Sequence, residues 1–291
     1  MNCPGCSPAR AMLSYRHLFH AGNFADVFKH ALLSRLLVLL TRKDRPLAYV
    51  DVYAGLGCYD LAHPWARKLA EYRHGIARLW PRDDIPALLE PYLGAVREDN
   101  RDGTLARYPG SPLIAARLLR AHDRLVLCEL NRDDHDVLRH GFAGDRRVGV
   151  HHLDAALGLK AFLPPDERRG LVLIDPPYDR AGELRRVLDA LAAAHRRWAT
   201  GVFAVWYPLL QLGAMQRFER DAASCGVPRM LQLELSVHPE FGSTGLRGCG
   251  VLVVNPPYGL ADEAPGWSEW LWQVLSPQRE GGWRVRWLVP E

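Results

Sequence analysis

Short apolar runs recur along the chain, separated by polar or amphipathic segments. The runs are rich in Val, Leu and Ile, which is typical of strands buried inside a sheet. Several intervening segments show helical periodicity, as at Glu183–Ala194 and Leu210–Cys225. This alternation predicts an α/β fold with a mostly parallel sheet and helices on both faces. The predicted strands are Leu47–Val52, Arg124–Cys128, Val148–His152, Leu171–Ile174, Val202–Trp206, Leu231–Val237, Cys249–Val254 and Trp283–Val289.

Two regions precede or interrupt this alternation. Apolar residues recur at helical spacing from Asn23, a suitable N-cap, to about Thr41, and predict a helix. The stretch from about Tyr59 to Arg120 contains many Pro and Arg residues and predicts short helices and loops. We therefore expect one domain from residues 12–58 and 121–291, with residues 59–120 as an inserted helical subdomain. Met12 suits a natural start, which makes residues 1–11 a poorly ordered extension.

Composition narrows the class of protein. The 291 residues are 48% hydrophobic and 24% charged, which excludes a disordered chain. The apolar run Leu36–Leu40 is far shorter than a bilayer span, and no secretory signal is present, so we expect no membrane association. The net charge is +4, and only four cations are Lys; this Arg excess suits phosphate binding or simply reflects codon usage.

The six Cys residues predict no disulfide framework in a chain of this length, and reduced thiols indicate a cytoplasmic location. Cys3 and Cys6 form one CxxC pair, but no second pair completes a zinc site. His17 and His20 lack a further ligand at convincing spacing. We therefore expect no metal site.

A Gly-rich turn follows the first predicted strand. Gly55 and Gly57 would let backbone approach a nucleotide-like ligand, and Asp51 supplies a carboxylate at the strand end. Glu129 follows the next strand, where an acidic residue typically accepts ribose hydroxyls. The spacing of 78 residues exceeds the usual value of about 20, and the insertion accounts for the excess. Asp154 ends the following strand and suits an adenine amino group; each acid could instead cap a helix.

The strongest motif is Asp175-Pro176-Pro177-Tyr178, directly after a buried strand. An exocyclic amine on adenine is a poor nucleophile because its lone pair is delocalised into the ring. The Asp175 carboxylate and the Pro176 carbonyl would accept its two N–H groups and aim the lone pair at a methyl donor. Tyr178 offers a ring on which a flipped-out base can stack. The motif predicts direct methyl transfer to an amino group, without a covalent enzyme intermediate.

A second copy of this pattern, Asn255-Pro256-Pro257-Tyr258, follows a later strand. Only the first copy comes after the Gly loop and the two acids in consecutive strands, so we interpret the second as a structural turn.

The segment Tyr15–His30 is rich in His, aromatic residues and cations. Within it, Tyr15 suits an aromatic lid over the ligand, and Lys29 and His30 could reach the cleft; a packed core face is the alternative.

Together these residues resemble the bacterial 23S ribosomal RNA adenine-N6 methyltransferases known as large-subunit methyltransferase J. The resemblance spans Met12 to Glu291, and DPPY itself occurs in many methyltransferases. The matching pieces are Met12–His30, Asp51–Gly57, Tyr108–Arg120, Arg168–Tyr178, Ala199–Pro208, the NPP turn and Trp287–Glu291. Of these, Met12–His30 and Tyr108–Arg120 are much more specific to the family than DPPY.

The resemblance implies a class I S-adenosylmethionine-dependent fold and methylation of N6 in a single adenosine of 23S rRNA. It implies cofactor contacts from His30, Ser111, Glu129, Asp154 and Asp175. Tyr53 stands where the family often has His, so we expect cofactor binding to persist with altered affinity. The Arg-rich insertion and the Tyr15 segment would form the RNA face. We expect a monomer that acts on protein-free rRNA or an early assembly intermediate, since a folded ribosome buries most sites.

Other functions remain as alternatives. A DNA adenine-N6 methyltransferase would use the same chemistry but usually has a larger recognition region. Guanine-N2 and protein-glutamine methyltransferases also use related turns, although glutamine enzymes favour Asn where Asp175 stands. A binding protein without turnover could keep the fold. The missing GxGxxG pattern disfavours a nicotinamide oxidoreductase.

Overall fold

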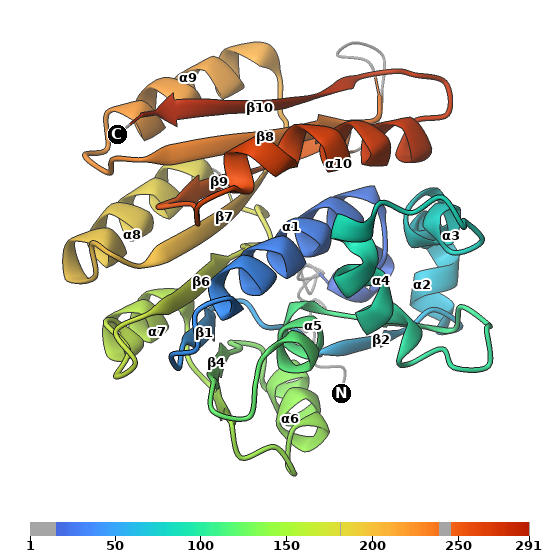
Figure 1. Cartoon of the computed structure of the whole chain (residues 1–291), viewed down its shortest axis with the longest axis horizontal. Helices are drawn as coiled ribbons and strands as arrows, with labels where there is room; N and C mark the ends of the chain where they lie inside the picture. The colour runs from blue at the N-terminus through green and yellow to red at the C-terminus, as the bar shows by residue number, and fades with distance from the viewer. Residues whose placement is uncertain (1–15, 181, 239–245, 291) are drawn as a thin grey trace, which may run out of the picture.

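One eight-stranded sheet organises the protein (Figure 1). The computed structural model describes residues 16–180, 182–238 and 246–290. Each predicted strand is confirmed, with ends that differ by at most two residues. In chain order, the strands are β1 (Ala48–Asp51), β4 (Arg124–Cys128), β5 (Val148–His151), β6 (Gly170–Ile174), β7 (Val202–Pro208), β8 (Met230–Ser236), β9 (Gly248–Val254) and β10 (Gly282–Val289).

The direction of the strands defines two edges of this sheet. The spatial order is β10-β8-β9-β7-β6-β1-β4-β5. Strands β5, β4, β1, β6 and β7 are mutually parallel, whereas β9 runs antiparallel to both β7 and β8. β10 pairs antiparallel with β8 at the outer edge. The parallel strands therefore all end at one edge, which we call the carboxyl edge, and β9 ends at the opposite, amino edge.

Helices cover both faces of the sheet. Val50, Val172 and Phe203 lie on one face, and their neighbours Tyr49, Leu171 and Ala204 on the other, because successive strand side chains alternate. The first face is covered by α7 (Ala155–Phe162), α8 (Glu183–Arg197) and α9 (Leu212–Ala223). The second is covered by α1 (Phe24–Thr41), α5 (Ser111–Leu118), α6 (Arg132–Gly141) and α10 (Leu260–Leu275).

Helix α1 is buried on nearly every side. It begins where predicted, because the Asn23 side chain accepts a hydrogen bond from the Asp26 amide. It packs against the sheet and also against α5, α10 and the short helix α4 (Glu90–Arg97). Its polar residues Asp26, Lys29, His30 and Arg35 are therefore buried and need partners within the protein. Arg35, for example, forms a two-pronged ion pair with Glu263 of α10.

The stretch between β1 and β4 contains the predicted short helices. In addition to α4 these are α2 (Pro64–Leu69), α3 (Ile76–Leu79), and the 3-10 turns η2 (Glu71–His74) and η3 (Ala87–Leu89). A further 3-10 turn, η1 (His17–Phe19), precedes α1 and contacts α2. The sequence analysis missed a two-stranded antiparallel sheet of β2 (Cys58–Asp60) and β3 (Arg107–Pro109), whose strands are too short to show alternation.

Helix α5 falls inside residues 59–120 but packs against β1 and β4. It thus serves as the crossover helix between these two parallel strands, while β2 and β3 bracket the smaller helices before it.

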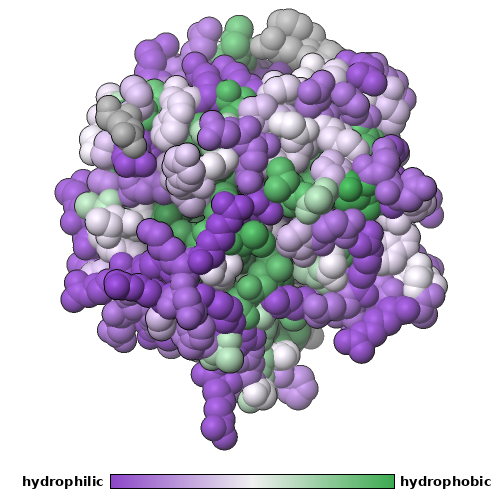
Figure 2. All heavy atoms as spheres, viewed as in Figure 1, coloured by the Kyte–Doolittle hydropathy of each residue, from purple (hydrophilic) through white to green (hydrophobic). Residues whose placement is uncertain are grey.

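Figure 2 shows one face of the molecule, whose surface is largely polar, with apolar side chains gathered in a central band. Within the part of the chain that the structure describes, no helix is both long and apolar enough to cross a membrane.

Candidate active site

The carboxyl edge brings the sequence-predicted residues together. Tyr53, Glu129, Asp154 and Asp175 follow β1, β4, β5 and β6. These four strands are neighbours in the sheet, so their following loops share one edge. The half-buried Tyr53 has a pKa raised to about 12, because burial and the nearby carboxylates of Glu183, Asp175 and Asp154 all disfavour its phenolate. Tyr53 is thus close to acids from two of the other loops.

The Gly-rich turn after β1 has backbone conformations that require glycine. Gly55 has φ +63° and Gly57 has φ +81°. A Cβ at Gly55 would lie 2.5 Å from the hydroxyl of Tyr59, and one at Gly57 would lie 2.9 Å from the side chain of Leu138. Both positions therefore exclude side chains on conformational and steric grounds. Gly55 is partly exposed and Gly57 is buried, so the turn is closely packed at the carboxyl edge.

Glu129 is bonded directly to this turn. Its Oε2 accepts a hydrogen bond from the Gly55 amide at 2.8 Å, and Oε1 accepts one from the Asn131 amide at 2.7 Å. Burial raises the pKa of Glu129, and these amides partly offset the rise. Each carboxylate oxygen can accept more than one bond, so Glu129 can hold the turn and still accept ligand hydroxyls.

Asp51 lies behind the turn and is fully buried. Its Oδ2 accepts bonds from the hydroxyls of Tyr49 and Ser111, both at 2.7 Å, and its Oδ1 accepts one from the Tyr53 amide at 3.1 Å. Burial raises its pKa to about 6 despite these bonds. Asp51 and Ser111 therefore fix the start of the turn from inside the protein.

The Asp175 carboxylate is one end of a series of side-chain contacts that begins at His17 in the N-terminal segment. Its Oδ2 accepts a bond from Lys29 Nζ at 2.6 Å. Lys29 also lies 2.8 Å from Asp26 Oδ1, and Asp26 Oδ2 lies 2.9 Å from His17 Nε2. Sequence reasoning selected Lys29 and Asp175 but missed Asp26. The available signal was an acid three residues before Lys29 in the predicted helix, which is the spacing of a helical ion pair.

Lys29 and Asp26 keep their charges although both side chains are buried. Burial alone would lower the pKa of Lys29, but the Asp175 and Asp26 carboxylates outweigh it and hold the pKa well above its usual value. Burial would likewise raise the pKa of Asp26, yet His17 and Lys29 hold it well below its usual range. Lys29 is therefore a charged ammonium that orients the Asp175 carboxylate.

Tyr178 adopts a left-handed backbone conformation, with φ +52°. Its hydroxyl donates a 2.6 Å bond to the carbonyl of Trp206 in β7, and its ring centre lies 5.6 Å from that of Trp206. A positive φ at a Tyr is uncommon and needs support from its surroundings. The bond to β7 fixes the Tyr178 ring beside Asp175.

The remaining predicted residues lie at more than one depth. His30 is buried, and its Nδ1 lies 2.8 Å from the Tyr108 hydroxyl, which in turn lies 3.1 Å from that of Tyr92. Burial, followed by the charge of Lys29, holds the pKa of His30 well below its usual value, so its ring is neutral. Asp154 caps α7 by accepting the Leu157 amide at 2.8 Å, while its half-buried side chain stays at the carboxyl edge. Tyr15, Cys3 and Cys6 lie outside the described residues.

The second tetrapeptide lies at the amino edge. Val254, the last residue of β9, is paired with Phe203 near the start of β7. The Asn255 side chain donates to the carbonyls of Ala199 and Gly201, which directly precede β7. Tyr258 is 95% exposed. The two motifs are therefore at opposite edges of the same sheet.

His17 and His20 each face a carboxylate. His17 lies against Asp26, and His20 Nδ1 lies 3.0 Å from both oxygens of Glu71. Hydrogen bonding to Glu71 raises the pKa of His20. Within the described parts of the chain, no group of three His, Cys, Asp or Glu side chains is arranged to hold a metal ion.

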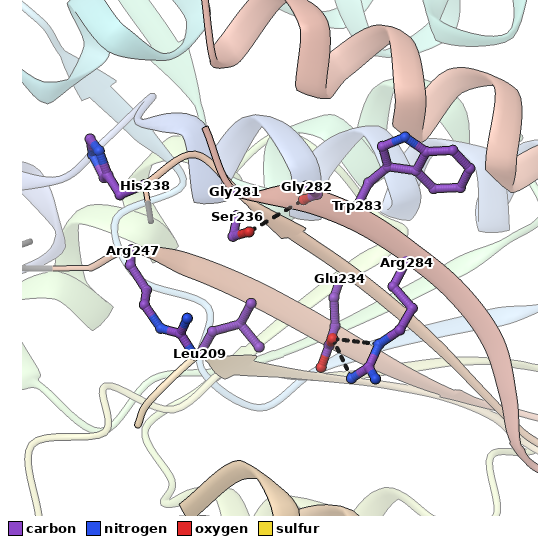
Figure 3. Close-up of a pocket in the computed structure, with 9 residues that line it drawn as sticks. All are labelled: Leu209, Glu234, Ser236, His238, Arg247, Gly281, Gly282, Trp283 and Arg284. Atoms are coloured by element: carbon purple, nitrogen blue, oxygen red, sulfur yellow. Dashed lines mark hydrogen bonds and ion pairs between the residues drawn. The ribbon is translucent and has the colours of Figure 1, made fainter. Parts of the chain in front are cut away.

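A separate hollow of about 390 Å³ lies at the last residues of β8 and the first residues of β10. It is lined by Leu209, Glu234, Ser236, His238, Arg247, Gly281, Gly282, Trp283 and Arg284. Figure 3 shows Glu234 and Arg284 facing each other, and the two side chains form an ion pair. It contains none of the residues that the sequence predicted for the site.

Comparisons with known proteins agree with this architecture. A family model described as "Ribosomal RNA large subunit methyltransferase D, RlmJ" matches residues 44–289. Proteins named ribosomal RNA large subunit methyltransferase J from Escherichia coli K12 and Haemophilus influenzae are 44% and 40% identical, each over 96% of this chain and 100% of the relative. A crystal structure of a Legionella pneumophila protein covers 92% of this chain and 98% of its own, with TM-score 0.86 and 36% identity.

These matches extend over the sheet and the residues at its carboxyl edge. They confirm the class I S-adenosylmethionine-dependent methyltransferase fold and the family resemblance found in the sequence. The chain therefore belongs to the family described as ribosomal RNA large subunit methyltransferase D, RlmJ, and is an S-adenosylmethionine-dependent methyltransferase.

Proposed function

We propose that the protein methylates N6 of a single adenosine in 23S rRNA, after that base has flipped into the pocket around Asp175-Pro176-Pro177-Tyr178. The observation that carries this proposal is the ion pair between Lys29 and Asp175 at the carboxyl edge. It fixes an oriented carboxylate beside the Gly turn and the Glu129 loop. The names of the similar proteins and their full-length identity support rRNA as the substrate class.

The carboxyl edge suits S-adenosylmethionine, which supplies an electrophilic methyl group when bound. Glu129 would accept the ribose hydroxyls, and Asp154 would accept the adenine amino group. The backbone of Gly55 and Gly57 and the Tyr53 ring would line the cofactor. Because Asp51, Ser111 and His30 are buried, we propose that they act mainly by holding these loops in position.

Asp175 and Pro176 would activate the target amine. Lys29 engages Asp175 Oδ2, which leaves Oδ1 to accept one N6–H group. The Pro176 carbonyl would accept the other, so that the nitrogen lone pair points to the methyl carbon. The nitrogen–carbon bond then forms as the carbon–sulfur bond breaks, and N6 afterwards loses its extra proton to Asp175 or water. The charged Lys29 stabilises the Asp175 carboxylate throughout.

The flipped adenine would stack on Tyr178, whose ring is held by the Trp206 carbonyl. Tyr15 would close over the base, and Lys29 would line the floor of its pocket. Residues 59–120 would form a subdomain that contacts RNA. The enzyme would act as a monomer on protein-free 23S rRNA or an early assembly intermediate, in the compartment where ribosomes are assembled.

The test is methyl transfer from tritiated S-adenosylmethionine to protein-free 23S rRNA prepared from cells that lack this gene, followed by nucleoside analysis. One N6-methyladenosine per rRNA is expected. Label on guanosine, DNA or protein would contradict the proposed substrate. Methylation of intact large subunits but not of naked RNA would contradict the proposed assembly stage.

A further inference from the structure

An aromatic pair next to the site, made of the exposed Trp65 and the partly buried Phe19, has no role in the chemistry proposed above. It lies where η1 contacts α2. The rings of Phe19 and Trp65 are stacked, with centres 5.4 Å apart and planes inclined by 14°. Lys68 Nζ lies 6.0 Å from the centre of the Phe19 ring. We call Phe19, Trp65 and Lys68 the η1–α2 platform.

The platform is fixed in place although it faces solvent. Trp65 remains 43% exposed, and Leu69, one turn further along α2, is 49% exposed. Helix α2 has proline at its first position and a cap from His63, whose Nδ1 accepts the Trp65 amide at 3.2 Å. The stack on Phe19 restricts the indole further. Trp65 therefore offers a rigid aromatic surface at small cost in conformational entropy.

The charge around the platform favours a polyanion. Residues 59–79 contain four Arg or Lys residues and two carboxylates. One of these carboxylates, Glu71, already binds His20 and Asn23. Arg67 and Lys68 are exposed, and no ion pair joins either of them to a carboxylate in the described part of the chain. Cations beside an exposed aromatic ring are the combination that binds single-stranded nucleic acid.

The platform also adjoins the catalytic groups. Phe19 is two residues from His17, which begins the chain of contacts through Asp26 and Lys29 to Asp175. The His17 ring packs on Tyr59, with centres 5.1 Å apart, and Tyr59 in turn lies against Gly55. Figure 1 shows α2 beyond the N-terminal end of α1. An RNA strand whose adenosine occupies the site would pass this surface.

We propose that the η1–α2 platform binds an unpaired nucleotide flanking the target adenosine: its base stacks on Trp65, and Lys68 and Arg67 contact its phosphates. This inference rests on the proposed function and adds the surface that selects a single-stranded flank. Stacking of one base is worth about 1–3 kcal/mol, which corresponds to a change of about 5- to 150-fold in RNA affinity.

The first experiment compares Trp65→Ala with wild type by steady-state kinetics on protein-free 23S rRNA. We expect KM for RNA to rise about 5- to 150-fold while kcat at saturating RNA and the Kd for S-adenosylmethionine stay within about 2-fold. Trp65→Phe should recover most of the loss because it keeps a stacking ring. The matched control is Trp287→Ala. Trp287 is 41% exposed and lies on β10, where it pairs with the start of β8 and is therefore at the amino edge.

A second experiment measures the ionic contribution. Lys68→Ala should reduce the slope of log KM against log salt by about 1, whereas Lys160→Ala, at an exposed position in the last turn of α7, should leave it unchanged. An abasic site in the RNA beside the target should weaken wild type to the level of Trp65→Ala. If KM for RNA is unchanged in Trp65→Ala, the proposal is overturned, whatever the oligomeric state of the variant.

Direct binding separates this inference from the proposed function. Fluorescence anisotropy with a labelled single-stranded oligouridine should show weaker binding by Trp65→Ala and normal binding by Trp65→Phe. If that pattern holds but wild type forms no N6-methyladenosine, the proposed function fails and the platform stands. If wild type methylates rRNA and Trp65→Ala binds both RNAs normally, the platform fails alone.

Discussion

Two tetrapeptides of nearly the same sequence follow buried strands of one sheet, yet their surroundings differ completely. Asp175 directly follows the parallel strand β6, pairs with Lys29 and shares the carboxyl edge with the Gly turn and two further acid-bearing loops. Asn255 directly follows the antiparallel strand β9 and binds two backbone carbonyls at the amino edge. The proline-rich turn therefore supplies a rigid geometry, while the direction of its strand decides which groups it meets.

The charge at the two turns differs in the same way. The carboxyl edge gathers several acids whose repulsion and burial must be offset by Lys29, the Gly55 amide and other donors. At the amino edge, Asn255 carries no charge and its amide group is satisfied by backbone alone. We infer that gathering the acids around the first turn costs folding free energy, whereas the second turn contributes to stability.

The largest effect is expected from Lys29→Met. The change leaves the buried Asp26 and the partly buried Asp175 without their cation, which should reduce the free energy of unfolding by about 3–5 kcal/mol. Urea denaturation of the purified variant at pH 7 measures the loss. Lys160→Met, at an exposed position, should change it by less than about 0.5 kcal/mol. A loss below about 1 kcal/mol for Lys29→Met would show that the ion-paired chain is not what stabilises this edge.

Asp175→Ala tests which turn performs chemistry. Removal of a group that stabilises the transition state should lower kcat by about 100- to 1000-fold or more. Asn255→Ala is the matched control and should keep kcat within about 2-fold of wild type. Single-turnover methyl transfer on 23S rRNA gives both rates, with circular dichroism as the check of folding. A comparable loss in the two variants would contradict the assignment of catalysis to Asp175.

The sequence predicted the α/β sheet and its strands, because short apolar runs alternate with helical patterns along the chain. The choice of the first turn over the second stays a prediction, which the Asp175 and Asn255 variants test. It also predicted that Glu129 and Asp175 each follow a core strand, and the parallel direction of β4 and β6 places both at the carboxyl edge. It did not predict that Asp51 is buried beneath the Gly turn. The burial depends on Ser111, which is distant in the sequence, and on the Tyr49 hydroxyl, which gives no periodic signal.

The contact of Asp26 with Lys29 and His17 was missed for a related reason. Helical spacing indicates one buried face, but α1 is covered on its other sides by α4, α5 and α10. Polar residues that would be solvent-exposed on an amphipathic helix are therefore inside the protein. The depth of a polar residue on such a helix depends on elements far away in the sequence, and local pattern does not contain this information.

Glu129→Ala sharpens the comparison on the cofactor side of the carboxyl edge. Loss of a charged acceptor of ribose hydroxyls should weaken S-adenosylmethionine binding by about 1.5–3 kcal/mol, or about 10- to 150-fold in Kd. Isothermal titration calorimetry measures this. Glu167→Ala removes a carboxylate that binds Arg124 at the start of β4, at the amino edge, and should leave Kd unchanged. Equal Kd values for wild type and Glu129→Ala would exclude Glu129 as the ribose acceptor.

The smallest effect belongs to the amino edge and concerns stability alone. Asn255→Ala removes two hydrogen bonds to the carbonyls of Ala199 and Gly201, which should cost about 1–2 kcal/mol. Asn255 also has φ +50°, a conformation that Gly adopts freely and Ala does not. Asn255→Gly should therefore be less destabilised than Asn255→Ala, with normal methyl transfer in both. Equal stability of the two variants would mean that the hydrogen bonds alone account for the role of Asn255, whereas a loss of activity in the Gly variant would show that this turn communicates with the distant site.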